Sequence, residues 1–204
     1  MSGKSKVLEN SFLYTFSSLL FKAVGLLLLP VYTLFLTPED YGITNLVNSF
    51  TGVATLIVAF SLYSAVIRFY TDYKGDRKKL KRFYGTVIIF TFISGTVFVS
   101  LGLIFNNVLI SWFFKGISFY PVVLIALLTL NFVSLHTIHQ SILQGMQEGK
   151  KLTIINLSVF GLQVCLNLLF IGVFKLGAVG VLLATFIINI GYFIYMLFDL
   201  KKII

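Results

Sequence analysis

Long apolar runs without alternation, separated by short polar joints, form the main pattern of this sequence. A membrane-spanning helix needs about 20 mostly apolar residues in a row, whereas a strand of a membrane barrel needs about 10 residues of alternating polarity. The runs therefore predict six spanning helices. Their approximate bounds are Val7–Leu36, Tyr41–Tyr70, Phe83–Ser111, Phe119–Gln144, Leu152–Phe174 and Ala178–Leu200.

The composition favours the same class of protein. Of the 204 residues, 58% are hydrophobic and 11% are charged, against roughly 45–50% apolar and about 25% charged in soluble domains. An ordinary core cannot bury so much apolar surface, which excludes a water-soluble globule. We predict an all-α integral membrane protein in which residues 1–204 form a single six-helix bundle, with joints too short for a soluble domain.

Basic residues are divided unequally between the two sides of the predicted bundle. One side collects Lys4, Lys6, Lys74, Arg77, Lys78, Lys79, Lys81, Arg82, Lys150, Lys151, Lys201 and Lys202, whereas the other has Lys115 and Lys175. Because cytoplasmic loops carry an excess of Lys and Arg, we expect a multi-pass protein with both termini in the cytoplasm. The net charge of +9 then indicates orientation and contact with anionic lipid headgroups, and not nucleic-acid binding.

Five of the six predicted helices carry polar residues at helical spacing. The candidate solute-binding residues among them are His136 and Gln140 on the fourth helix and Asn156, Gln163 and Asn167 on the fifth. Polar side chains are costly against lipid, so these stripes should face one another or water. Hydrogen bonds between helices would explain any single one, but together the stripes predict a partly hydrated cavity.

The third predicted helix is plainer than the others. Its small residues, Thr91, Ser94 and Gly95, are expected to let a neighbouring helix approach closely.

Two basic residues lie within predicted spans. Lys22 falls near the middle of the first helix, where its insertion costs roughly 2.5–3.5 kcal/mol. Such a cation suits an anionic solute, above all a phosphate, although a backbone carbonyl or a carboxylate could also hold it. Arg68 lies a few residues from the cytoplasmic joint, where it could serve the same solute or extend toward the headgroups.

The chain shows no pattern typical of a catalytic or metal site. His136 and His139 are spaced to share a metal, but no further histidine exists and Cys165 falls opposite the polar stripe of its helix. Paired carboxylates, a nucleophile elbow, a phosphate-binding loop and a dinucleotide signature are missing from the sequence. Asp199 lies nearly at the end of the last predicted helix. We therefore expect a protein that is not an enzyme and that has neither a metal nor a cofactor.

Several short motifs resemble those of a known transporter family. They are Leu29-Pro30-Val31-Tyr32-Thr33, Leu36-Thr37-Pro38-Glu39-Asp40-Tyr41-Gly42, Arg68-Phe69-Tyr70, Gln144-Gly145-Met146-Gln147-Glu148-Gly149-Lys150 and Leu176-Gly177-Ala178-Val179-Gly180-Val181. The motifs resemble those of the Wzx-type flippases of O-antigen and capsule polysaccharide, in the multidrug/oligosaccharidyl-lipid/polysaccharide superfamily. The likeness covers the whole chain. Family members have twelve or fourteen helices, so the chain resembles an N-terminal lobe without the C-terminal one.

The resemblance implies a flippase of the bacterial inner membrane. Such a protein moves an undecaprenyl-diphosphate-linked oligosaccharide between leaflets by alternating access, usually coupled to an ion gradient (H⁺ or Na⁺). Lys22 and Arg68 match cavity bases of the family and would meet the diphosphate, while the amides of the stripes would meet sugar hydroxyls. Asp40 matches an acid near the outer gate of related lipid II flippases, although acids at the start of a helix also serve as caps. Leu34 departs from the family, which often has a base there.

The identity of the protein partner and two alternative functions stay open at this point. A second lobe or a second copy of the chain is the expected protein partner, beside the lipid bilayer and the lipid-linked oligosaccharide. A cation-coupled drug exporter of the same superfamily is an alternative, but it needs an intramembrane carboxylate. A scaffold subunit that transports nothing, in a glycan-assembly complex, is a second alternative, and it would tolerate apolar residues at Lys22, Gln140 and Gln163.

Overall fold

The computed structural model describes residue 15, residues 29–30 and residues 32–203. Most of the predicted helix Val7–Leu36, including Lys22, therefore lies outside the described residues. The elements that follow are α2 (Pro38–Val58), α3 (Leu62–Tyr73), α4 (Arg77–Ile104), α5 (Asn106–Phe113), η1 (Phe119–Val123), α6 (Leu124–Gly145), α7 (Gly149–Asn167), η2 (Leu168–Val173) and α8 (Gly177–Ile203). Helices and connecting turns account for all the described part of the chain, which contains no strand.

The described residues include five helices that are long and apolar enough to cross a membrane. They are Pro38–Val58, Arg77–Ile104, Phe119–Gly145, Gly149–Val173 and Gly177–Lys201. This confirms the all-α class and a multi-pass membrane protein. The sixth predicted span is the one that falls outside the described residues.

The second predicted span is not one continuous helix. The run Tyr41–Tyr70 is interrupted between α2 and α3, where Phe60 and Ser61 have φ angles of 46° and 52°. The Ser61 amide donates to the Leu56 carbonyl at 3.3 Å, which closes α2 with a six-residue turn. A glycine usually occupies such a left-handed position, so the sequence gives no signal for this break.

The third predicted span differs at both ends. It begins earlier, at Arg77, because the Asp76 carboxylate accepts from the amides of Lys78 and Lys79 at 3.0 and 3.1 Å and caps the helix. It ends earlier, because the backbone leaves the helical region at Phe105, before the short helix α5. The predicted run Phe83–Ser111 is thus divided between α4 and α5.

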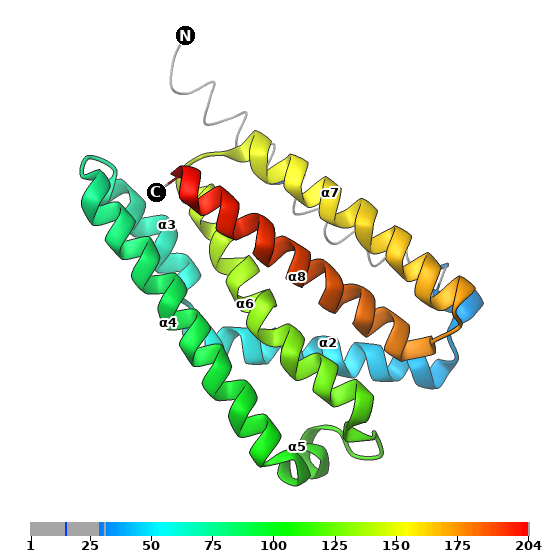
Figure 1. The fold of residues 1–204 in the computed structure, drawn as a ribbon. Coiled ribbons are helices and arrows are strands. Elements are labelled where there is room, and N and C mark those ends of the chain that lie inside the picture. The colour runs from blue at the N-terminus through cyan, green and yellow to red at the C-terminus, as the bar shows by residue number, and fades with distance from the viewer. Residues whose placement is uncertain (1–14, 16–28, 31, 204) are drawn as a thin grey trace.

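Helix α6 is the centre of the bundle (Figure 1), and it packs against α8, α4, α3 and α2. Of its span, 61% is buried, against 22–39% for the other four. The other helices keep large apolar side chains exposed along one side, among them Ile89, Ile93 and Val97 of α4. This surface suits lipid and not water.

One end of the bundle gathers the predicted cytoplasmic segments. Figure 1 shows the α3–α4 turn, the α6–α7 turn and the end of α8 together at the upper left. Lys74 lies in the α3–α4 turn, and Lys79 and Lys150 lie in the first turns of α4 and α7. We call this the base-rich end of the bundle and the other one the opposite end.

Gly95 of α4 lies against α6, as the sequence predicts for a small residue: a Cβ atom there would overlap the side-chain oxygen of Asn131. Thr91 is also buried, and Ser94 is half-buried. Two turns further along α4, a Cβ atom at Gly102 would come within 2.9 Å of Leu127 Cδ2. The two glycines therefore set the distance between α4 and α6.

Candidate functional site

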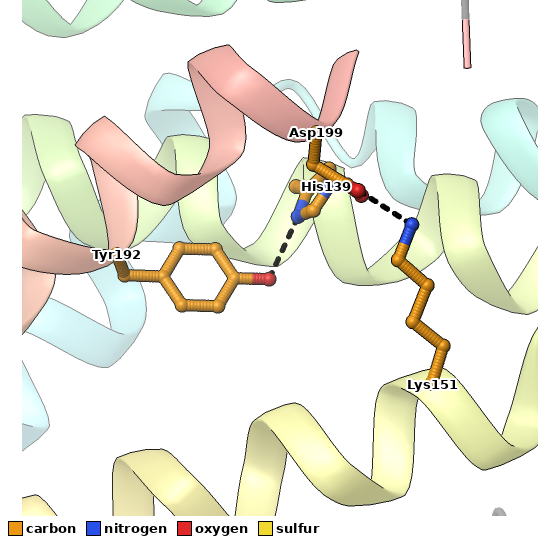
Figure 2. Close-up of polar contacts among 4 residues, drawn as sticks. All are labelled: His139, Lys151, Tyr192 and Asp199. Carbon is orange, nitrogen blue, oxygen red and sulfur yellow. Dashed lines mark hydrogen bonds and ion pairs between the residues drawn. The ribbon is translucent and has the colours of Figure 1, made fainter. Parts of the chain in front are cut away.

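Four side chains of α6, α7 and α8 lie together near the base-rich end, three of them buried and Lys151 partly exposed. We call this group the ionic cluster (Figure 2): His139, Lys151, Tyr192 and Asp199. The Lys151 ammonium donates to Asp199 Oδ1 at 2.6 Å. His139 Nε2 lies 3.2 Å from Asp199 Oδ2, and His139 Nδ1 lies 2.8 Å from the Tyr192 hydroxyl. A neutral imidazole with its proton on Nε2 satisfies both contacts, donating to the carboxylate and accepting from the phenol.

Asp199 is not a terminal residue in the structure. Helix α8 continues to Ile203, which places the carboxylate inside the bundle with 6% of its side chain exposed. A buried carboxylate is costly unless a cation and hydrogen bonds compensate it. Lys151 supplies the charge and, with 31% of its side chain exposed, keeps contact with the surroundings of the bundle.

A second layer of side chains joins the same three helices one turn deeper. We call it the polar seam: His136 and Gln140 of α6, Asn156 of α7 and Asn189 of α8. Gln140 Nε2 lies 2.9 Å from His136 Nε2 and donates to Asn156 Oδ1 at 3.0 Å, while His136 Nδ1 lies 3.1 Å from Asn189 Oδ1. Two amide protons and one imidazole proton satisfy all three contacts when His136 carries its proton on Nδ1.

The structure therefore brings together three of the predicted site residues, His136, Gln140 and Asn156, and bonds them to one another. His136 also stacks on Tyr192, with ring centroids 3.5 Å apart. These contacts hold α6, α7 and α8 together, as interhelical hydrogen bonds do in membrane proteins.

The two remaining amides of α7 lie toward the opposite end. Gln163 donates to the Thr185 hydroxyl of α8 at 3.4 Å. Asn167, which is fully buried, donates to the Tyr32 hydroxyl at 3.2 Å. Its Oδ1 atom is buried and accepts no hydrogen bond from the described residues.

Asp40 links two helix starts at the opposite end. Its carboxylate accepts from the Thr37 amide at 3.2 Å, as part of a capping box, and from the Thr37 hydroxyl at 2.8 Å. It also accepts from the Ala178 amide of α8 at 2.9 Å. The approach is close because the neighbouring residue is Gly177, where a Cβ atom would lie 2.6 Å from Asp40 Oδ1. One carboxylate thus stabilises the N-termini of both α2 and α8.

The predicted cationic residues do not join these groups in the described part of the chain. Arg68 is exposed on α3, and Lys22 lies outside the described residues. Among the residues that the structure describes, no three His, Cys, Asp or Glu side chains are grouped so as to hold a metal ion.

A cavity of about 270 Å³ lies between α2, α6 and α8. We call it the threonine cavity, because its polar lining consists of four threonines and one asparagine. The lining residues are Val47, Asn48, Thr51, Gly52, Thr55, Ala126, Thr129, Val133, Leu182 and Thr185.

The ionic cluster is the group that sequence reasoning missed. Helical spacing places Tyr192 and Asp199 on one face of α8. This shared face was the one signal in the sequence for the cluster. The sequence does not reveal that Asp199 is buried, because the residue lies close to the expected end of its helix. It does not reveal the role of Lys151 either, because this residue falls among the predicted cytoplasmic bases.

Comparison with known proteins identifies the family of the chain. Searches of curated proteins and of solved structures found no match. A family model described as "Polysaccharide biosynthesis protein" matches residues 7–202. The chain, a multi-pass membrane protein whose helices are joined by buried polar side chains, therefore belongs to the polysaccharide biosynthesis protein family.

Proposed function

We propose that this chain is the N-terminal lobe of a flippase for an undecaprenyl-diphosphate-linked oligosaccharide in the bacterial inner membrane. The family match over residues 7–202 carries the proposal. A membrane bundle with hydrogen-bonded polar side chains and a cavity that includes polar residues in its lining supports it, because a purely anchoring bundle needs neither.

In this proposal the two ends of the substrate meet different parts of the lobe. Lys22 and Arg68 would neutralise the diphosphate, which needs charged donors in a low-dielectric interior. Asp40 would stand near the outer gate, where it already ties α2 to α8. A second lobe, or a second copy of the chain, would complete the path, and an H⁺ or Na⁺ gradient would drive alternating access.

The test uses cells that carry the gene. Deletion should abolish surface polysaccharide, and the Lys22→Ala variant should fail to restore it at unchanged abundance in the membrane. Lys81→Ala, which changes an exposed base near the start of α4, is the matched control and should restore export. Normal surface polysaccharide in the deletion strain would refute the proposal.

A scaffold role is the second candidate, and the polar seam favours it. Gln140 satisfies His136 and Asn156 at once, so these groups already have partners without a substrate. A scaffold requires folding and not the charge at residue 22. Lys22→Met would then keep full glycan assembly, whereas a flippase would lose it.

A further inference from the structure

The threonine cavity has hydroxyl oxygens on three helices, and its described lining residues carry no charge. Thr55 donates to the Thr51 carbonyl at 2.7 Å, Thr129 to the Ile125 carbonyl at 2.7 Å, and Thr185 to the Val181 carbonyl at 3.0 Å. The hydroxyl protons of these three threonines are thereby used within their own helices. Their oxygens keep acceptor capacity, part of which Thr185 uses for Gln163 at 3.4 Å. The cavity wall therefore accepts hydrogen bonds better than it donates them.

Asn48 adds N–H donors. This residue is exposed, lines the cavity and makes no hydrogen bond to the described residues. An amide has two N–H donors and a carbonyl acceptor. Together, the lining offers acceptors on α2, α6 and α8 and donors on α2.

This chemistry distinguishes between the parts of a lipid-linked sugar. A phosphate is an acceptor-only anion that requires cations or several N–H donors, and the described residues of the lining supply no cation and only one side-chain amide. A sugar ring carries several O–H groups that both donate and accept, and its apolar faces suit Val47, Ala126 and Leu182 of the same wall.

The depth of the cavity also requires a ligand whose polar groups are satisfied. Asn48 is ten residues from the first residue of α2, which is about 15 Å at 1.5 Å per residue, or roughly half of a 30 Å hydrocarbon core. Threonine and asparagine at this depth are unfavourable against lipid.

We propose that the threonine cavity binds one uncharged sugar ring of the transported glycan, through Asn48 and the hydroxyls of Thr51, Thr129 and Thr185. The inference rests on the proposed flippase function and deepens it. A volume of about 270 Å³ lies just below the 300–1,000 Å³ of drug-sized ligand sites, which suits one ring and not a whole repeat unit.

The first experiment fills the cavity. Gly52 lines it, and a Cβ atom at residue 52 meets nothing within 4 Å. Gly52→Phe should lower surface polysaccharide at least tenfold at unchanged protein abundance. Gly42→Phe is the control, because residue 42 is on the same helix with equally open surroundings and lies outside the cavity. Equal export by both variants would overturn the proposal.

The second experiment removes the hydroxyls and keeps the shape. The triple variant Thr51→Val, Thr129→Val and Thr185→Val should lower export at least tenfold, whereas serine at the same three positions should restore it. Thr86→Val, on an exposed face of α4, should have no effect. Export by the triple valine variant at the parent level would overturn the sugar site, while loss of export on gene deletion would leave the flippase function standing.

The third measurement tests the charge of the sugar. Composition analysis of the exported polymer should find at least one uncharged sugar per repeat. A polymer made wholly of charged sugars would overturn the assignment.

Discussion

At the scale of single residues, the ionic cluster shows how an acid is kept inside a membrane bundle. Asp199 uses one oxygen for Lys151 and the other for His139. The three side chains come from three helices, so their contacts also determine how α6, α7 and α8 meet near the base-rich end. Removing one partner of such a pair costs more than removing both.

Replacement of Lys151 should therefore be worse than replacement of Asp199. Lys151→Met leaves a buried carboxylate without its cation, and we expect a loss of about 2 kcal/mol, below the roughly 3–5 kcal/mol of a fully buried pair because Lys151 is partly exposed. Asp199→Asn keeps an acceptor for His139 and should lose about 1 kcal/mol. Thermal unfolding in detergent measures both.

The double variant Lys151→Met/Asp199→Asn should be about as stable as Asp199→Asn alone, because it leaves no buried charge. Lys81→Met is the control and should unfold like the parent. If Lys151→Met matched this control, the buried ion pair would not contribute to stability.

At the scale of elements, two features decide how the helices fit together. The α4–α6 contact depends on the missing side chain at Gly95, next to Asn131. The second span depends on a left-handed turn at Phe60 and Ser61. The first feature was predictable from the small residues of α4, whereas the second was not.

Gly95→Ala should destabilise the protein by about 1–3 kcal/mol, because overpacking forces neighbouring atoms apart. Gly85→Ala, on the same helix and with nothing within 4 Å, should be neutral or stabilising. Adding Asn131→Ala to Gly95→Ala should recover part of the loss, since it removes the overlapping oxygen. Thermal unfolding compares the three variants, and equal stability of Gly95→Ala and Gly85→Ala would contradict the packing.

Ser61→Gly should stabilise the protein by roughly 1 kcal/mol, because residue 61 has a φ of 52° and glycine adopts this region without steric cost. Ser158→Gly, at an exposed helical position in α7, should instead destabilise by about 0.5 kcal/mol. The opposite signs of the two Tm shifts are the diagnostic result. Destabilisation by both substitutions would argue against the left-handed turn.

At the scale of the whole molecule, the distribution of charge predicts the orientation in the membrane. The α3–α4 and α6–α7 turns, together with the starts of α4 and α7 that follow them, carry most of the bases of the described residues and lie at one end. Because such segments remain in the cytoplasm, the α5–η1 connection should face outward.

Cysteine labelling in intact cells tests this orientation. In a Cys165→Ser background, Ser118→Cys should react with an impermeant thiol reagent from outside, whereas Gly75→Cys should react only after the membrane is opened. Both positions are exposed. Reaction of Gly75→Cys in intact cells would reverse the orientation.

The sequence was sufficient for the membrane class and for the faces of the helices, and less informative about depth and pairing. Periodicity places Gln140 and Asn156 on polar faces, but it carries no axial register, so the bond between them could not be foreseen. The threonine cavity could not be predicted either. The sequence alone suggests that Thr129 and Thr185 make ordinary interhelical contacts, and only the position of α2 beside them creates the cavity.

The carboxylate shared by the starts of α2 and α8 has a mechanical consequence. Because Asp40 is bonded to Thr37 and to Ala178, we expect the first turns of α2 and α8 to move together when the lobe changes conformation. The interruption at Phe60 and Ser61 is where we expect α2 to bend relative to α3.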